Sequence, residues 1–545
     1  MKRSRVLSGP AGLALLAGLV TAFAHPPFGV LPGILGYGLL FALVDQTDGE
    51  HPLRSAFWRA FLAGVAYFAV GCWWVAEAFL VDAAEQGWMA PFAVVLLAAG
   101  LALFWGFGGL LYRALRPRDT LLKVLVFAGA LSLLEWTRGH ILTGFPWNLP
   151  GETWRAGSPP SQAAALVGAY GLTWITLVAM AALAVPFAFG WRRSTWSLFG
   201  GGVAVVFALY GYGFWHLSHG DPEPSAGPVV RVVQPDVRQE AKYDADKFQD
   251  IVGRYLRLTA QPSALEARPR AGEPLHALEP DIVIWPEGAI PAAANDVLNP
   301  NLWVYTAIVK ALKPGQILLM GTYRVDERAV KPTYYNSLYA LRRDGDALTV
   351  LGIYDKHRLV PFGEYMPASK LMKAIGFQKL VHVAEDGFSP GPAPHPMPLV
   401  GFGLVQPLIC YESLFPSLVR EGARLAGARP GWIVNVSNDA WFGQTSGPWQ
   451  HLNLASYRAI EEGLPIVRAT PTGVSAVIDA EGRRLETLGL GKSGVIDAAL
   501  PGARLRPTAF GEYGETAFWI MIALSAAALV PAIRRRVRRR PVRAA

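Results

Sequence analysis

Three side chains that together could transfer an acyl group stand at matching places in the sequence. Cys410, Glu287 and Lys356 each come directly after a strand-like apolar run. The three runs are residues 402–409, 281–286 and 351–355. Because α/β proteins present reactive groups just past strand ends, we expect the thiol, the carboxylate and the ammonium to meet in one crevice. Such a set can cleave an acyl group by covalent catalysis.

The segments that must position these groups are of two kinds. Of the 545 residues, 52% are hydrophobic and only 17% are charged, and the mean hydropathy is +0.27. Residues 13–217 are long apolar runs with short polar breaks, residues 224–506 are typical of a soluble α/β protein, and residues 517–533 are apolar again. This composition excludes an ordinary soluble enzyme and predicts a membrane part beside a soluble part.

About eight apolar runs approach the ~20 residues needed to cross a hydrocarbon core of ~30 Å. They are residues 10–24, 27–45, 57–80, 90–112, 120–137, 162–190, 195–217 and 515–533. The first two runs are separated by His25, Pro26 and Pro27. Basic residues at 2–5 precede the first run, so a cleavable signal peptide is the alternative to a first span. The spans that follow directly favour an uncleaved first span.

The distribution of positive charge predicts the orientation in the membrane, because short cytoplasmic loops are rich in Lys and Arg. Alternate loops differ in this respect. The rich loops contain Arg54, Arg59, Arg113, Arg116, Arg118, Lys123, Arg192 and Arg193, and seven arginines follow the last run, between residues 534 and 543. We therefore expect both termini in the cytoplasm of a bacterium and the large domain in the periplasm, on the outer side of the inner membrane.

The net charge of +9 comes mostly from those seven tail arginines. Such a run can bind nucleic acid, but its place directly after an apolar span favours anchoring on anionic lipid, so we expect no nucleic-acid partner. The chain has two cysteines, and Cys72 lies within an apolar run, which excludes a disulfide framework. A lone thiol kept in an oxidising compartment suggests a use for Cys410. No His or Cys spacing indicates a metal site, and no cofactor is expected.

The soluble part alternates strand-like and helix-like segments. Strands are expected at residues 229–234, 281–285, 317–323, 337–342, 350–356, 402–410, 432–437, 466–470 and 474–479. Helices are expected at residues 243–258, 302–312 and 448–462, and from residue 416 onward. Several strands follow one another without a helix, so the pattern indicates mixed sheets covered by helices rather than a simple doubly wound fold. Residues 387–394 form a loop rich in Pro and Gly.

Three motifs of the soluble part resemble the Glu-Lys-Cys motifs of the nitrilase superfamily. They read WPE at 285–287, YDKHRLVPFGE at 354–364 and CYE at 410–412. The flanking membrane spans, FPWNLPG at 145–151 and VSNDAWF at 436–442 resemble one branch, the bacterial apolipoprotein N-acyltransferases. The resemblance covers essentially the whole chain, because its motifs and its membrane spans occur together in the right order.

This resemblance implies a polytopic helical membrane bundle of about eight spans joined to a nitrilase-like αββα sandwich that faces outward. The expected parts are a membrane domain of about seven helices (residues 1–218), a periplasmic catalytic domain (226–506), a last transmembrane helix (515–533) and a basic cytoplasmic tail (534–545). The expected reaction moves an acyl chain from a phospholipid, phosphatidylethanolamine by resemblance, to the α-amino group of the lipid-modified N-terminal cysteine of a diacylglyceryl-apolipoprotein. A monomer is expected.

The catalytic roles follow from the chemistry of each group. A cysteine with the ordinary pKa of ~8.5 is mostly protonated at neutral pH. Glu287 would therefore take the thiol proton of Cys410, return a proton to the leaving group and then activate the incoming amine. Lys356 would stabilise the tetrahedral oxyanion, helped by the backbone N–H of Tyr411. Glu364 would orient Lys356 or the base, although a capping or surface role is the alternative.

The remaining candidates support the site or contact substrate. Glu412 would hold the Cys410 turn or touch the substrate, and the Tyr411 side chain would form pocket wall. Residues expected to bind substrate are Trp147, Asn148, Tyr243 and Trp441. Aromatic residues are also common at membrane interfaces without any such role. Tyr243 stands where many family members are expected to carry Trp, which affects only a local lid contact.

The sequence contains two further motif matches and is compatible with two rival functions. Residues 387–391 match G-x-S-x-G, but this motif needs a strand before it and a helix after it, and prolines follow instead. Residues 491–493 are similar to the end of a P-loop, but Glu486 replaces the first glycine. A membrane-tethered amidase that uses water is the first rival function. A lipid-binding scaffold is the second, and the intact Glu287, Lys356 and Cys410 argue against it.

Overall fold

The computed structural model describes residues 9–219, 227–263, 265, 278–328, 331–366 and 387–529. The chain divides into two compact units. The helical unit comprises Met1–Gly220 and Thr508–Ala545, and the sheet unit comprises Asp221–Pro507. The basic tail expected at residues 534–545 and the basic residues 2–5 lie outside the described residues.

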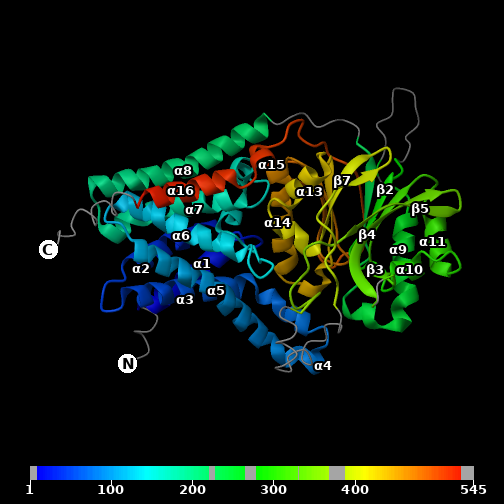
Figure 1. Ribbon diagram of the computed structural model, residues 1–545, viewed down its shortest axis with the longest axis horizontal. Helices are drawn as coiled ribbons and strands as arrows, with labels where there is room; N and C mark the ends of the chain where they lie inside the picture. The colour runs from blue at the N-terminus through cyan, green and yellow to red at the C-terminus, as the bar shows by residue number, and fades with distance from the viewer. Residues whose placement is uncertain are drawn as a thin grey trace, which may run out of the picture. The chain divides into compact units, whose positions relative to one another are not determined.

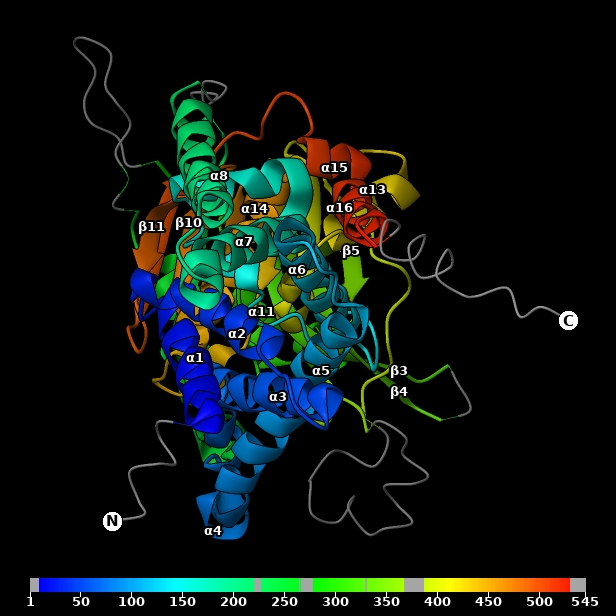
Figure 2. The same ribbon diagram turned by 90° about the vertical axis from the view of Figure 1, so that its left-hand side faces the viewer.

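The helical unit consists of apolar helices joined mostly by short turns (Figure 2). Its α-helices are α1 (Pro10–Ala24), α2 (Gly36–Asp45), α3 (Pro52–Gly71), α4 (Ala83–Gln86), α5 (Ala90–Leu115), α6 (Thr120–Arg138), α7 (Ala164–Phe189), α8 (Arg193–Ser218), α15 (Ala509–Tyr513) and α16 (Thr516–Ala527). Its short 3-10 helices are η1 (Leu31–Leu35), η2 (Trp73–Phe79), η3 (Gly87–Met89), η4 (Pro150–Thr153) and η5 (Pro159–Ala163). Helices α1, α3 and α5 have a proline in the first turn, where its missing N–H costs nothing.

Within the described residues, four helical segments are long and apolar enough to cross a membrane. They are Ala83–Leu115, Thr120–His140, Pro159–Phe189 and Arg193–Ser218. Helices α3 and η2 form a fifth if the pair, bent by 53° at Cys72, counts as one span. The apolar helices Pro10–Ala24, Leu31–Asp45 and Thr516–Ala527 are shorter. The second apolar run, predicted to start at residue 27, becomes helical only at Leu31. Pro27 and Gly29, which has φ of 65°, keep the preceding residues out of the helix.

Small residues let these helices approach closely. Helix α3 packs on α5, where a Cβ added to Gly64 would lie 2.9 Å from the Cβ of Ala102. Such small-residue contacts stabilise helix pairs within a bilayer. At the start of α7, Gly168 has φ of 69°, and an added Cβ would lie 2.3 Å from the ring of Phe510. Only glycine fits there, because it has no Cβ to clash with Phe510 and adopts a positive φ without strain.

The sheet unit contains two six-stranded mixed sheets. The first has the order β12 (Gly494–Ala499), β1 (Val229–Gln234), β2 (Ile282–Trp285), β3 (Ile317–Asp326), β4 (Thr333–Asp344) and β5 (Ala347–Asp355). The second has the order β11 (Arg484–Leu488), β10 (Ser475–Ile478), β9 (Ile466–Ala469), β8 (Trp432–Val436), β7 (Gly403–Ile409) and β6 (Met397–Leu399). Strands β1 to β3 pair in parallel, as do β7 to β9, and the outer pairs are antiparallel.

Helices cover the outer faces of both sheets (Figure 1). Those of the first sheet are α9 (Phe248–Ala260), α10 (Ala294–Val297) and α11 (Trp303–Ala311), and those of the second are α13 (Leu418–Ala426) and α14 (Gly447–Glu462). Short 3-10 helices are η6 (Glu240–Tyr243), η7 (Ala245–Lys247), η9 (Cys410–Leu414) and η10 (Asp439–Phe442). The mixed sheets expected from the sequence are therefore confirmed.

Strand β2 explains why the sheet strands read as continuous apolar runs. Ile282 and Ile284 belong to the core that strands of both sheets form, whereas Val283 and Trp285 belong to the core shared with the helices. The Trp285 ring lies 5.0 Å from that of Tyr255 on α9. A strand buried on both faces needs apolar residues at every position, and its first polar side chain then follows at its end.

The predicted strands and helices of the soluble part fall on observed elements, with differences at the ends. The helix expected from residue 243 begins at Phe248, because η6 and η7 occupy the preceding residues. The strand expected to end at residue 410 ends at Ile409. Strands β6, β11 and β12 were not predicted.

Candidate active site

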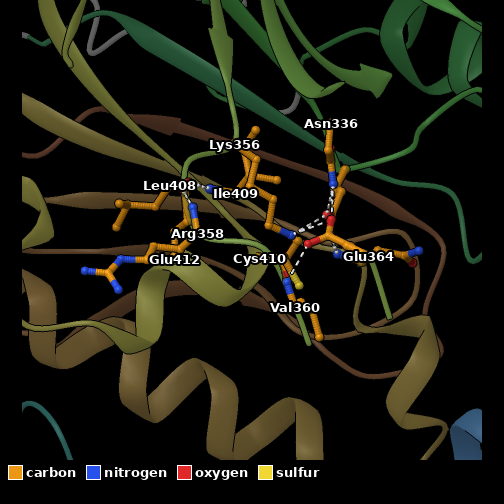
Figure 3. A network of polar contacts seen from close by, with 12 residues as sticks. Asn336, Lys356, Arg358, Val360, Glu364, Leu408, Ile409, Cys410 and Glu412 are labelled. Carbon is orange, nitrogen blue, oxygen red and sulfur yellow. Dashed lines mark hydrogen bonds and ion pairs between the residues drawn. The ribbon is translucent and has the colours of Figure 1, made fainter. Parts of the chain in front are cut away.

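Cys410 lies at a sharp turn between β7 and η9. Its φ of 50° is in the left-handed region, which residues other than glycine rarely adopt. The side chain is partly buried, and Figure 3 shows its sulfur near the side chain of Lys356, whose charge acts on the thiol. A strained residue held at a strand end is common where a side chain has a function.

Glu287 follows the end of β2 and is 7% exposed. One carboxylate oxygen, Oε1, accepts hydrogen bonds from Asn336 Nδ2 at 2.7 Å and from Lys356 Nζ at 3.2 Å. The other, Oε2, accepts from the backbone N–H of Asn438 at 2.7 Å. The carboxylate is thus fixed from β4, from the end of β5 and from the end of β8.

The Lys356 ammonium lies between two carboxylates (Figure 3). It is 1% exposed and donates to Glu364 Oε1 at 2.9 Å as well as to Glu287. Asn336 Nδ2 also donates to Glu364 Oε1, at 2.7 Å, and the Val360 N–H donates to Oε2 at 2.8 Å. Glu364 and Glu287 thus hold the ammonium between them, and Asn336 joins both carboxylates. That Glu364 orients Lys356 for catalysis stays a prediction.

The electrostatics of the site define the protonation states. Burial opposes ionisation of Glu287, but Lys356 and Asn336 outweigh it and hold its pKa below the ordinary value. Burial disfavours the charge on Lys356 too, yet Glu287 and Glu364 raise its pKa. Burial and the Glu287 charge raise the pKa of the Cys410 thiol to about 12, against the opposing effect of Lys356. At neutral pH the site therefore holds a carboxylate, an ammonium and a neutral thiol.

Glu412 is fully buried and holds the Cys410 turn. Its carboxylate accepts hydrogen bonds from Tyr354 Oη at 3.0 Å and from the backbone N–H groups of His357 at 2.8 Å, Arg358 at 3.1 Å and Ile409 at 2.8 Å. These bonds connect the turn that carries Cys410 with the loop that follows Lys356. Of the two roles expected from the sequence, the geometry supports positioning.

Comparison with known proteins identifies the family. Residues 238–510 match the carbon-nitrogen hydrolase family, and residues 17–183 match the apolipoprotein N-acyltransferase N-terminal domain. The apolipoprotein N-acyltransferase of Caulobacter vibrioides is 57% identical over 96% of this chain and 94% of its own. That of Bradyrhizobium diazoefficiens is 37% identical over 97% and 95%, and that of Rhodopseudomonas palustris is 36% identical over 94% and 93%.

The chain belongs to the apolipoprotein N-acyltransferase family. It is accordingly an acyltransferase of the carbon-nitrogen hydrolase superfamily. The carbon-nitrogen hydrolase match contains Glu287, Lys356 and Cys410, and the N-terminal match falls within the helical unit. The resemblance drawn from the sequence motifs is therefore confirmed.

In this acyltransferase, hydrogen bonds link Tyr243 of η6 to Asn438, the residue whose backbone N–H donates to Glu287. The Asn438 amide donates to Gln239 Oε1 at 2.8 Å, and Gln239 donates to Tyr243 Oη at 3.2 Å. Tyr243 is 69% exposed. Hydrogen-bonded residues thus connect the Glu287 carboxylate to the exposed Tyr243 ring, and the contact of Tyr243 with substrate stays a prediction.

The other expected substrate-binding residues differ in exposure. Trp441 on η10 is partly exposed. Trp147 and Asn148 are 1% and 4% exposed inside the helical unit, where Trp147 packs on Trp74 with ring centroids 4.5 Å apart. The Tyr67 hydroxyl donates to the carbonyl of Asn148 at 2.6 Å. These contacts make Trp147 and Asn148 part of the packing, and their contact with substrate stays a prediction. Tyr411 is buried and packs against Phe415, and its place in a pocket wall stays a prediction.

Two residues of the site were missed by the sequence motifs. Asn336 lies in the interior of β4, one residue before the strand segment that was predicted. Its signal was an amide within a strand, where Asn is unfavourable. Asn438 lies within a recognised motif, but its backbone N–H carries the contact, and sequence alone does not show such a bond.

The rejected motifs have structural roles here. The loop with the G-x-S-x-G match braces the site, since the Gly391 N–H donates to the carbonyl of Lys356 at 2.8 Å. Residues 387–391 form neither helix nor strand, and residues 384–386 before them lie outside the described residues. Residues 491–493 form the turn before β12. Among the described residues, no group of three or more His, Cys, Asp or Glu could hold a metal ion.

Proposed function

We propose that this protein transfers a fatty acyl chain from a phospholipid to the α-amino group of the lipid-modified N-terminal cysteine of an apolipoprotein. The reaction proceeds through a thioester on Cys410, in two half-reactions. Phosphatidylethanolamine is the expected donor. The observation that carries the proposal is the fixed set of Glu287, Lys356 and Cys410 in a chain of this family.

In the first half-reaction the Cys410 sulfur attacks the carbonyl carbon of the donor ester. Glu287 takes the thiol proton as the C–S bond forms, because the thiol is neutral at rest. Lys356 stabilises the negative oxygen of the tetrahedral intermediate. When the C–O bond of the ester breaks, Glu287 returns the proton to the departing oxygen, which leaves a lysophospholipid and a thioester.

In the second half-reaction a neutral α-amine attacks the thioester carbonyl. Glu287 accepts a proton from the amine, and Lys356 again stabilises the oxyanion. The C–S bond breaks, the sulfur of Cys410 recovers a proton from Glu287, and the product is an amide. Glu364 and Asn336 keep both charged groups in place through the whole cycle.

The proposed setting is a bacterial inner membrane, with the catalytic domain in the periplasm and the protein acting as a monomer. The apolar helices of the helical unit support membrane attachment. Both substrates carry lipid chains, so a membrane-bound enzyme meets them at a high local concentration and in a restricted orientation.

The proposal is tested by following the thioester after the donor has been removed. The acylated protein is mixed with a diacylglyceryl lipopeptide that has a free α-amine, and amide formation is compared with release of free fatty acid. We expect rapid amide formation and slow hydrolysis without the acceptor. Fast release of fatty acid, unchanged by the lipopeptide, would instead indicate an amidase-like hydrolase.

A further inference from the structure

A buried cluster of polar side chains lies behind the nucleophile, and the proposed mechanism does not use it. Its members are Asn435 on β8, Asp439 on η10, His451 on α14 and Arg468 on β9. None of the four is more than 1% exposed. We call these four residues the strand-end clamp.

The clamp is connected from end to end by hydrogen bonds and ion pairs. Arg468 donates to the side-chain oxygen of Asn435 and, at 2.7 Å, to Oδ2 of Asp439. His451 Nδ1 lies 3.0 Å from Oδ1 of Asp439. Buried charges need such partners, because an unpaired charge would strongly destabilise the fold.

Both ends of the clamp meet the backbone that carries the nucleophile. Asn435 Nδ2 donates to the carbonyl of Leu408 at 2.9 Å. At the other end, His451 Nε2 lies 3.2 Å from the carbonyl oxygen of Cys410. Burial and the Arg468 charge lower the pKa of His451, so the ring is neutral; its one N–H, at Nδ1, donates to Asp439, and Nε2 can only accept, from the Ser413 hydroxyl. The Ser413 hydroxyl also donates to the Cys410 carbonyl at 2.9 Å. The clamp therefore spans the last residues of β7 and the residue with left-handed φ.

One alternative is that this cluster is a second catalytic centre. Ser413 Oγ lies 3.0 Å from His451 Nε2, so Ser413, His451 and Asp439 stand in the order of a serine-hydrolase triad. All three are at most 1% exposed, which leaves no space for a substrate beside the hydroxyl. The Ser413 hydroxyl is also engaged with the Cys410 carbonyl. The contacts thus serve the turn rather than a second reaction.

We propose that the strand-end clamp is a positioning device for acylation, which holds the carbonyl groups of Leu408 and Cys410 so that the thiol stays aligned with Glu287 and Lys356. A strained backbone conformation persists only where the surrounding structure holds it. The clamp supplies that hold at the Leu408 carbonyl through Asn435 and at the Cys410 carbonyl through the Ser413 hydroxyl that His451 contacts, and Glu412 supplies it at the Ile409 N–H. This inference rests on the proposed thioester mechanism.

Two variants of one residue test the proposal. In His451→Gln the longer amide reaches about as far as Nε2 and can still bond to the Ser413 hydroxyl beside the Cys410 carbonyl, but the contact with Asp439 is lost. In His451→Asn the amide can replace Nδ1 toward Asp439, but nothing reaches Ser413. We expect His451→Asn to lower the rate of acyl-enzyme formation at saturating phospholipid about 100-fold, as for a misplacement of ~1 Å. His451→Gln should keep most of the rate, and the donor concentration for half-saturation should not change in either variant.

Asp497→Asn is the matched control, because its ion pair with Arg231 is also largely buried but joins β1 to β12, away from the site. All three variants should unfold at lower temperature, and only His451→Asn should lose acylation well below its unfolding temperature. Two results would show that the clamp is purely structural. One is an equal loss of acylation rate in His451→Asn and His451→Gln. The other is a loss of acylation rate in Asp497→Asn that matches its loss of stability.

A second readout separates this inference from the proposed function. Alkylation of Cys410 by iodoacetamide needs no lipid, and Cys72 is buried. We expect the alkylation rate of Cys410 to follow the acylation rate: highest in the wild-type protein, slightly lower in His451→Gln and lowest in His451→Asn. If the wild-type protein forms no acyl-enzyme, the proposed function fails, and the order of the alkylation rates still decides whether the clamp positions the thiol.

Discussion

Among the residues of the site, Glu287 is the ionised group that can accept a proton, and the thiol of Cys410 is not already a thiolate. Burial keeps Cys410 protonated, whereas the hydrogen bonds to Glu287 keep the carboxylate ionised. In the proposed mechanism Glu287 therefore takes the thiol proton as the sulfur attacks, and Lys356 is the fixed cation that stabilises the oxyanion. If the thiol ionised at its ordinary pKa, the rate of acylation would rise with pH up to about 8.5.

The pH dependence of acylation follows from these shifts. Because the Glu287 pKa lies below its ordinary value, the base is ionised above that value and is lost only as the pH falls through the lowered pKa. The thiol contributes no rise near pH ~8.5, since its pKa is about 12. We expect a flat rate of acyl-enzyme formation between about pH 6 and pH 9 in single-turnover measurements. In Glu287→Gln the residual rate should instead rise about tenfold per pH unit, with the thiolate fraction.

Variants of the base and of the cation should both prevent acylation although the thiol remains. Glu287→Gln removes the proton acceptor, and Lys356→Ala removes the charge beside the oxyanion, so each should slow acyl-enzyme formation by about 10² to 10⁴. Gel or mass detection of the thioester after mixing with phospholipid measures this directly. A normal rate of thioester formation in Glu287→Gln would confine that residue to the second half-reaction or to structure.

At the scale of elements, the fold was predictable where a strand or helix has a strong apolar pattern. Strands β2 and β7, which precede Glu287 and Cys410, are mostly buried, whereas β5, which precedes Lys356, is buried only at its last two residues. The C-terminal ends of all three could be placed within about one residue. The edge strand β11 escaped prediction because it is mostly exposed and polar, and β6 is three residues long. The partners of Glu287 escaped because Asn336 comes from the middle of a strand and Asn438 contributes a backbone N–H. Long-range side-chain contacts of this kind have no local sequence pattern.

A glycine in β3 sets the position of Glu287, which gives a test at this scale. A Cβ added to Gly321 would lie 2.5 Å from the carbonyl oxygen of Pro286 and 2.7 Å from Cα of Glu287. Gly321→Ala should therefore push Glu287 away from Cys410 and lower acylation about 100-fold, with ~1–3 kcal/mol lost from the free energy of unfolding. Gly489→Ala is the control, because an added Cβ there meets nothing within 4 Å. Activity of Gly321→Ala equal to that control would show that the strand absorbs the methyl group.

At the scale of the whole molecule, the account requires the sheet unit on the outer side of the membrane. Cysteine at exposed Asp346 in the sheet unit should react with a membrane-impermeant maleimide in intact spheroplasts of a Cys410→Ser strain. Cysteine at exposed Glu50, next to the arginine-rich segment 54–59, should react only after permeabilisation. The reverse pattern would favour an amidase that faces the cytoplasm.

The central claim is that Cys410 carries the acyl chain, and the mass of the intact protein tests it most directly. The purified protein is incubated with phosphatidylethanolamine of a single acyl composition, and Cys410→Ser serves as the control, because a serine hydroxyl without an activating base is a far poorer nucleophile. The account predicts a mass increase of one acyl chain that hydroxylamine removes and that Cys410→Ser lacks. No increase, or an increase that persists in Cys410→Ser, would contradict it.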